Sequence, residues 1–174
     1  MGTDPAAQWV MDTSTFTHFC RAGHSGVLER LAPQGIVLVP REVEVEIDKA
    51  RNLHPGVPSV DSAAWAERIF MNDDEQWTAL HVKVVLGGGT GEHMGECAVI
   101  ACAKHRGLVA VLDERAAVEQ AKLRHIPFID TMRLVAQAHT EIFDRDQNQT
   151  IALIDALLAT DMRLPVRSGA ELFR

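Results

Sequence analysis

Hydrophobic residues along this chain gather into short, nearly uninterrupted runs that alternate with longer segments of helical spacing. Short runs of β-branched and other apolar residues indicate buried strands. The run at 77–85 mixes polar and apolar residues, so we predict an edge strand there. Five segments are predicted to be strands: 8–12, 36–39, 77–85, 108–112 and 126–129.

Helices are predicted between and after these strands, where capping residues and helical periodicity coincide. Pro40 suits the first turn of one helix, and Asp61 suits the cap of another. The acidic stretch 72–76 is interpreted as a solvated turn. The predicted helices cover residues 14–20, 26–32, 41–50, 62–71, 92–105, 115–125, 132–143 and 149–159.

The alternation of strands and helices predicts an α/β fold. We expect a central, mostly parallel sheet of about five strands with helices on both faces. The 174 residues suit a single domain over 1–174. Within it we expect a core at about 8–143 and extra C-terminal helices at about 147–174.

Composition excludes several classes of protein. With 47% hydrophobic and 24% charged residues the chain has an ordinary globular composition, and no apolar run is long enough to cross a membrane. The first ten residues lack a basic head and an apolar core, so we expect no export signal and a cytoplasmic protein. Three cysteines without a C-x-x-C pair argue against structural zinc and a disulfide framework, and Cys97 and Cys102 are expected in the core.

The formal net charge of −7 argues against binding nucleic acid by bulk attraction. If the ligand is a nucleic acid, its phosphates must be met locally, by metal ions or by a small basic patch. A solvated helix face would account for most of the basic residues that follow two of the predicted strands, and the same residues are the candidates for such a patch: Arg41, Lys49, Arg51, Arg115, Lys122 and Arg124.

Acidic residues mark the carboxyl edge of the predicted sheet, where ligands bind in such folds. Asp12 and Asp113 follow strands, and Glu46 and Glu96 lie in helices that start at the same edge. Two carboxylates 4 Å apart repel by about 4 kcal/mol at an effective dielectric of 20. Four acids at one edge therefore favour a hard divalent cation, Mg²⁺ or Mn²⁺, as one ion or two.

Plainer interpretations stand beside this one. Asp12 and Asp113 are residue types that cap helices, and Glu42 and Glu44 are expected to face solvent. Glu92 and Glu96, four residues apart, would share one helix face. His93 lies about 100° around that helix from Glu92; we expect it to be exposed, with a role in supporting the ligands or contacting a phosphate as the alternative.

Four stretches resemble the PIN-domain nucleases, in particular the VapC-like toxins and their chromosomal relatives with C-terminal helices. They are VMDTSTF, VPREVEVEI, GECAVIACAKHRG and VLDERAAVEQAKLRHIPFIDTMRLV. The resemblance implies a Mg²⁺- or Mn²⁺-dependent ribonuclease that cuts RNA and is often neutralised by an antitoxin. It further implies catalytic acids at Asp12, Glu46, Glu96 and Asp113, of which Asp12, Glu96 and Asp113 hold metal, with hydroxyls at Ser14 and Thr131.

The stretch GGGTGEHMGE contains two Gly-Glu pairs. We assign the family acid to Glu96, after Gly95, and give Glu92 a supporting role as an auxiliary acid or a contact to metal-bound water. We also expect a homodimer, for which the apolar stripe of the 149–159 helix is one candidate surface; that stripe would suit the core equally well.

Two other functions remain open. A non-catalytic regulatory or interaction module could keep the fold and some of the acids. A phosphatase with Asp12 as nucleophile is weaker, because Ser14 stands where a D-x-D motif would place its general acid.

Overall fold

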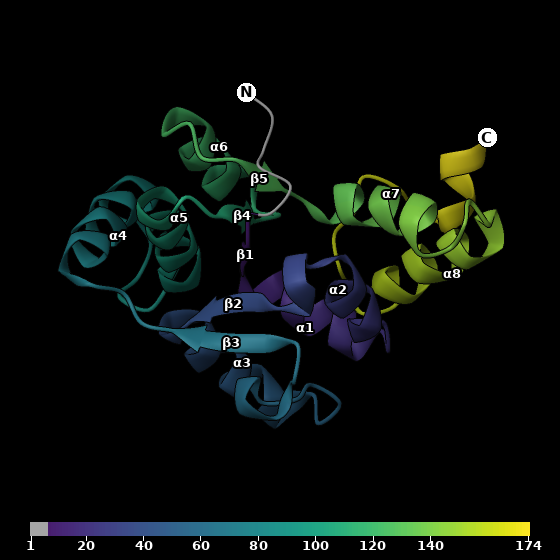
Figure 1. Cartoon of the computed structure of the whole chain (residues 1–174), viewed down its shortest axis with the longest axis horizontal. Coiled ribbons are helices and arrows are strands. Elements are labelled where there is room, and N and C mark those ends of the chain that lie inside the picture. Colours follow the sequence, from purple (N-terminus) through teal and green to yellow (C-terminus); the bar gives the residue numbers. More distant parts are fainter. Residues whose placement is uncertain (1–6) are drawn as a thin grey trace.

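The computed structural model describes residues 7–174, so the expectation of no export signal in the first ten residues lies mostly outside the described part. A five-stranded parallel sheet runs through the centre of the molecule in the order β3-β2-β1-β4-β5 (Figure 1). The predicted α/β fold with a parallel sheet of five strands is confirmed. The strands are β1 (Trp9–Met11), β2 (Val37–Pro40), β3 (Ala66–Ile69), β4 (Val109–Val111) and β5 (Phe128–Ile129).

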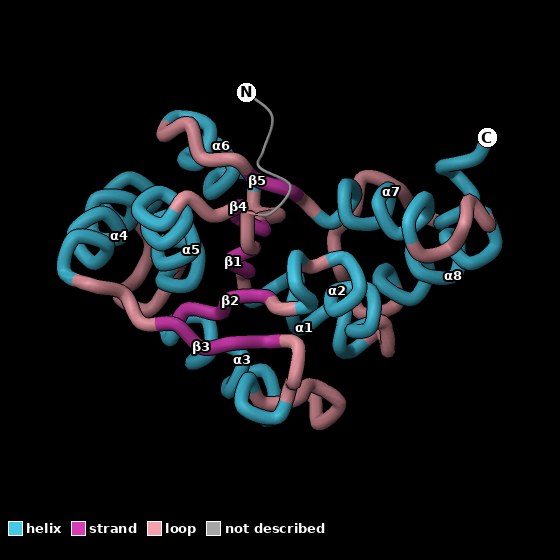
Figure 2. Tube along the Cα trace, viewed as in Figure 1, coloured by secondary structure: helices cyan, strands magenta, loops and turns pink. Residues whose placement is uncertain are grey.

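Helices cover both faces of the sheet (Figures 1 and 2). On one side lie α4, α5 and α6, and on the other lie α2, α7 and α8. The helices are α1 (Thr13–Arg21), α2 (Ser25–Leu31), α3 (Arg41–Leu53), α4 (Asp73–Leu86), α5 (Met94–Arg106), α6 (Arg115–Leu123), α7 (Thr131–Glu141) and α8 (Gln147–Leu158). None of the helices within residues 7–174 is long and apolar enough to span a membrane.

The predicted edge strand at 77–85 is wrong, because this segment lies inside α4. Asn72 and Glu75 form a capping box, in which each side chain accepts a hydrogen bond from the other residue's backbone N–H. Outward-facing Trp77, Leu80 and Val84 are exposed, while Thr78, Ala79 and Val82 are buried on the opposite face. A surface helix normally has apolar residues on one face only. Because α4 has them on two opposite faces, its sequence imitates the alternation of polar and apolar residues in a strand.

The predicted helix at 62–71 is also wrong, because its second half forms β3. Residues Ala66 to Ile69 pair in parallel with Val37 to Pro40 of β2, at the sheet edge. Ser59, and not Asp61, accepts the capping hydrogen bond of the short 3₁₀ turn Val60–Ser62. The predicted number of five strands is therefore correct, but one of the five was placed at 77–85 instead of at β3.

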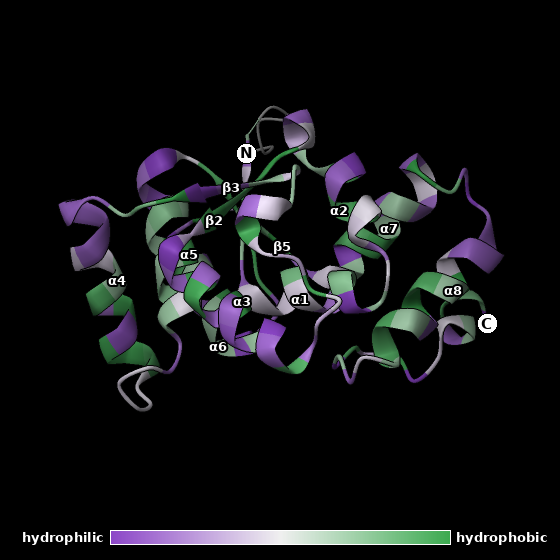
Figure 3. Ribbon diagram, turned by 90° about the horizontal axis from the view of Figure 1, so that it is seen from below, coloured by the Kyte–Doolittle hydropathy of each residue, from purple (hydrophilic) through white to green (hydrophobic). Residues whose placement is uncertain are grey.

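The core lies between the sheet and its helices, where Figure 3 shows hydrophobic residues along the strands. Cys97 and Cys102 of α5 are buried free thiols, as predicted. The apolar stripe of α8 is also internal, since Leu153, Ile154 and Leu157 are fully buried. This stripe belongs to the core and leaves no apolar face on α8 for a second protein.

Candidate metal and active site

A cleft of about 980 Å³ opens at the carboxyl edge of the sheet. Six carboxylates line it, together with two histidines and two arginines. The lining residues are Asp12, Ser14, His18, His93, Glu96, Asp113, Glu114, Arg115, Ala116, Glu119, Asp161, Met162 and Arg163. The structure thus brings Asp12, Glu96 and Asp113 together from the ends of β1 and β4 and the start of α5.

Asp12 both caps α1 and reaches the cleft. Its Oδ1 accepts a hydrogen bond of 3.0 Å from Thr15 N, yet its side chain remains in the cleft lining. Only 3% of Asp12 is exposed. Burial, and then repulsion from Asp113, raises the pKa of Asp12 to about 7. The cap and the site are therefore compatible at this position.

Asp113 is held by three hydroxyl and amide donors. Thr131 donates from its N–H (2.8 Å) and its Oγ1 (2.6 Å), and Thr15 Oγ1 donates at 3.1 Å. Since Thr15 also donates its backbone N–H to Asp12, one threonine fixes both acids relative to each other. Thr131 lies where the sequence places a supporting hydroxyl, whereas Thr15 was not singled out.

Glu46 of α3 is anchored beside the cleft. Its carboxylate accepts hydrogen bonds from Thr13 Oγ1 and, at 3.0 Å, from Gly95 N. A Cβ at position 95 would lie 2.7 Å from Glu46 Oε2, so a side chain there would displace this carboxylate from its place against α5. The Gly-Glu pair therefore has a structural meaning: Gly95 admits Glu46, and Glu96 follows it into the cleft.

Glu96 lies in the first turn of α5 and lines the cleft. Burial raises the pKa of Glu96, and the negative charges of Glu46 and Glu114 raise it further. Within residues 7–174, no side chain donates a hydrogen bond to the Glu96 carboxylate, and no lysine or arginine forms an ion pair with it.

Glu92 is not brought to the cleft. Helix α5 begins at Met94 because His93 has a left-handed backbone (φ 61°), so Glu92 precedes the helix and does not share a face with Glu96. Its exposed side chain folds back over the glycine-rich loop, where a Cβ at Gly88 would collide with the carboxylate. The expectation that Glu92 and Glu96 share one helix face is therefore wrong.

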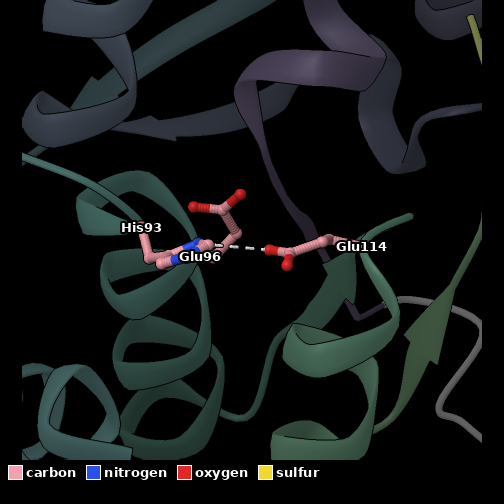
Figure 4. A group of neighbouring side chains, drawn as sticks. All are labelled: His93, Glu96 and Glu114. Atoms are coloured by element: carbon pink, nitrogen blue, oxygen red, sulfur yellow. Dashed lines mark ion pairs between the residues drawn. The ribbon is translucent and has the colours of Figure 1, made fainter. Parts of the chain in front are cut away.

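The sequence interpretation missed His93 and Glu114 as a pair. Figure 4 shows them facing each other beside Glu96, with His93 Nδ1 3.3 Å from Glu114 Oε2. One possible ligand atom from each of the three residues lies within 4.8 Å of the others. His93 is half-buried in the cleft rather than exposed as expected. The one sequence signal for a role of Glu114 is its position next to Asp113.

Glu44 contradicts the expectation of a solvent-facing residue. It is 4% exposed, because Arg68 pairs with its carboxylate and Arg41 Nη1 donates to it at 2.5 Å. Glu42 is partly buried, and within the described chain its Oε2 has no hydrogen-bond partner. Neither glutamate lines the cleft.

Most of the candidate basic residues lie away from the cleft. Of the six candidates only Arg115 lines the cleft, and Arg163, which follows α8, joins it. Four of the others are engaged elsewhere: Arg41 with Glu44, Arg51 with Asp48, Lys122 with Glu119, and Arg124 with Gln120.

The donor set suits a divalent metal. Asp12 and Glu96 both have raised pKa values caused by burial and by other carboxylates, which is the electrostatic signature of a place where a cation is stabilising. Carboxylate oxygens are the ligands that Mg²⁺ and Mn²⁺ prefer. The acids that line the cleft are therefore of the ligand type that such an ion prefers, and in residues 7–174 the group with metal-ligand spacing is His93, Glu96 and Glu114.

Comparison with known proteins gives one finding about the family. A family model described as a PIN domain matches residues 8–173, which span all five strands and all eight helices of the described chain. No curated protein matches the chain. The match agrees with the resemblance found in the sequence. The chain belongs to the PIN-domain family, whose fold is of the nuclease type.

Proposed function

We propose that this protein is a metal-dependent endoribonuclease that hydrolyses RNA phosphodiester bonds. The observation that carries the proposal is the acidic cleft lined by Asp12, Glu96 and Asp113, none of which has a lysine or arginine partner in residues 7–174. Membership of the PIN-domain family supports the same chemistry. The cytoplasmic location expected from the sequence is part of the proposal.

Asp12, Glu96 and Asp113 would hold Mg²⁺ or Mn²⁺, and Glu46 would act as the fourth acid beside Glu96. A bound ion lowers the pKa of water and stabilises the charge that develops on phosphate oxygens. The chain's own contribution is position: Thr15 and Thr131 fix Asp113, and Gly95 N fixes Glu46. If a second ion binds, His93, Glu96 and Glu114 form the group best spaced for it. Ser14 lines the same cleft and can contact substrate.

Three variants test the proposal. We expect Asp12→Asn and Glu96→Gln each to lower the rate of RNA cleavage by about 10²–10³-fold or more, because each removes a charged ligand. Glu92→Gln is the matched control, since it changes a glutamate that precedes α5 and does not line the cleft. Cleavage of a labelled RNA in Mg²⁺, in Mn²⁺ and in EDTA measures the effect, and circular dichroism checks folding.

Full activity in EDTA would overturn the proposal, as would equal losses in Glu92→Gln and Glu96→Gln. Calorimetric titration with Mn²⁺ separates the nuclease from a non-catalytic module. No uptake at millimolar Mn²⁺ favours the module, whereas uptake that is lost in Asp12→Asn supports the proposed site.

The proposal keeps the expected protein contacts, a homodimer or a bound antitoxin, and moves them to a different surface. Trp77 is 63% exposed on the outer face of α4, beside exposed Leu80 and Val84. These residues recur at helical spacing and form an apolar stripe that suits another protein. Self-association that Leu80→Asp weakens in sedimentation equilibrium would support a homodimer through α4. If the unmodified chain and Leu80→Asp are both monomeric, a homodimer through α4 is excluded.

A further inference from the structure

We propose that the segment following α8 is part of the substrate site, with Arg163 and Arg115 binding phosphates of a single-stranded RNA that enters the acidic cleft. This inference rests on the proposed nuclease function and extends it to the C-terminal helices. Arg115 begins α6 and Arg163 follows α8, and these helices lie on opposite sides of the sheet (Figures 1 and 3). Both arginines nevertheless line the same cleft as Asp12.

The segment that carries Arg163 is anchored on both sides. Thr160 Oγ1 lies 2.7 Å from His18 Nδ1 of α1, and the next side chain but one, Met162, is buried against the core. Burial lowers the pKa of His18, so this contact joins two neutral side chains at neutral pH. Arg163 directly follows the anchored Met162 and is thereby held at the cleft.

Farther along, the C-terminal turn is fixed to α8. Gly169 N donates to Asp155 Oδ1 at 2.7 Å, and a Cβ at Gly169 would lie 2.6 Å from Ile151 Cα. Only glycine allows this approach of the two backbones. The chain after α8 is thus packed on the helix, and Arg163 lies between two fixed points, Met162 and Gly169.

The charges of the cleft supply the second line of argument. Six carboxylates line it, yet within residues 7–174 neither Arg115 nor Arg163 forms an ion pair with any of them. Both side chains are exposed. Guanidinium groups left without partners at the border of an acidic cleft are suited to phosphate oxygens of an incoming ligand.

The depth of the acids selects the form of the RNA. Asp12 is almost completely buried, so a phosphodiester must enter the cleft to reach it. A single strand can bend and splay its bases to do so, whereas a duplex holds its phosphates on a stiff surface. With a net charge of −7 the chain offers no bulk attraction, so two local arginines would contribute a large share of the phosphate contacts.

The experiment measures binding apart from cleavage. In an Asp12→Asn background, fluorescence anisotropy gives the Kd for a labelled RNA of about 12 nucleotides over a range of salt concentrations. We expect Arg163→Ala and Arg115→Ala each to weaken binding about fivefold to tenfold and to reduce the salt slope by about 0.7–1. Arg163→Lys should retain most of the affinity. Arg167→Ala, an exposed arginine on the same segment outside the cleft lining, is the matched control and should stay within about twofold.

Unchanged binding by Arg163→Ala, or an equal loss in Arg167→Ala, would overturn the inference. Equal affinity for a duplex of the same sequence would overturn the preference for a single strand. The two proposals fail differently. If the unmodified chain cleaves RNA and Arg163→Ala leaves KM unchanged, the inference fails and the nuclease stands. If nothing is cleaved but Arg163→Ala still weakens binding, the RNA site stands without the nuclease.

Discussion

Buried acids occur in two regions of this molecule, and their surroundings are opposite. Glu44 and Glu75 lie under arginines on the side of the sheet near β3, and these contacts lower the pKa of both carboxyls. Asp12 and Glu96 lie in the cleft with other acids, and their pKa values are raised. The carboxylate is thus neutralised by arginine in one region, whereas Asp12 and Glu96 have no lysine or arginine partner within residues 7–174.

The Glu75 region shows complete compensation. Glu75 is 0% exposed, and Arg106 donates to its two oxygens at 2.6 and 2.8 Å while Asn72 N donates at 2.9 Å. Arg106 also donates to Phe70 O at 2.6 Å. Such a bidentate pair satisfies the charge and most of its hydrogen-bonding capacity, so this region needs no external ligand.

In the described part of the chain, Asp12, Glu96 and Asp113 of the cleft have no such partner, and only Glu119 in the cleft lining pairs with a lysine, Lys122. The threonine and amide donors of the cleft satisfy oxygen atoms but supply no positive charge. The contrast supports the proposed metal site: an acid with an arginine partner stabilises the fold, whereas an acid held among other acids is a candidate ligand for a cation from outside.

Breaking the compensated region should have the largest effect on stability. Arg106→Ala leaves Glu75 buried and unpaired, and we expect the free energy of unfolding to fall by about 3–5 kcal/mol. For a chain of this size that corresponds to a melting temperature lower by roughly 10 °C. Arg51→Ala, which breaks the exposed pair with Asp48, is the control and should cost less than about 1 kcal/mol. Similar losses in both variants, measured by thermal unfolding at neutral pH, would contradict the comparison.

The acids of the cleft should have a smaller effect on the free energy of unfolding, and this effect should depend on pH. Because the folded pKa of Asp12 is raised from 3.8 to about 7, the protonated form is favoured in the folded state. The contribution of Asp12 to the free energy of unfolding is complete below about pH 4 and is lost as the pH rises through 7. The loss is at most about 4 kcal/mol, and we expect about 2 kcal/mol. Glu44 and Glu75, with lowered pKa values, act in the opposite direction and lose their contribution as pH falls below their usual range.

Denaturant unfolding of the metal-free protein between pH 4 and 8 measures this dependence, with EDTA present. We expect Asp12→Asn to remove the decline above pH 5 and to be more stable than the parent chain at pH 8. Added Mn²⁺ should stabilise the parent at pH 8 and the variant much less. A metal-free Asp12→Asn protein that is less stable than its parent at pH 8 would show that the cleft carries no excess charge.

Much of the fold was predictable because its signals are local. Four of the five strands are short apolar runs, and the rule that ligands bind at the carboxyl edge of parallel strands placed Asp12 and Asp113 at the cleft. The segments that became β3 and α4 were assigned the wrong way round. The type of β3 depends on its pairing with β2, which is not a local property, and the two apolar faces of α4 imitate the alternation of a strand.

The sequence by itself therefore determined the α/β alternation, the family, and the acids that follow the strands, since each follows from short-range periodicity or a contiguous motif. Tertiary structure alone decided which acids are neutralised. Glu75 meets Arg106 across 31 positions, His93 meets Glu114 between two helices, and Arg163 reaches the cleft from the far end of the chain. Electrostatic energy depends on distance in space, so the partner of a charge becomes known only when the chain is folded.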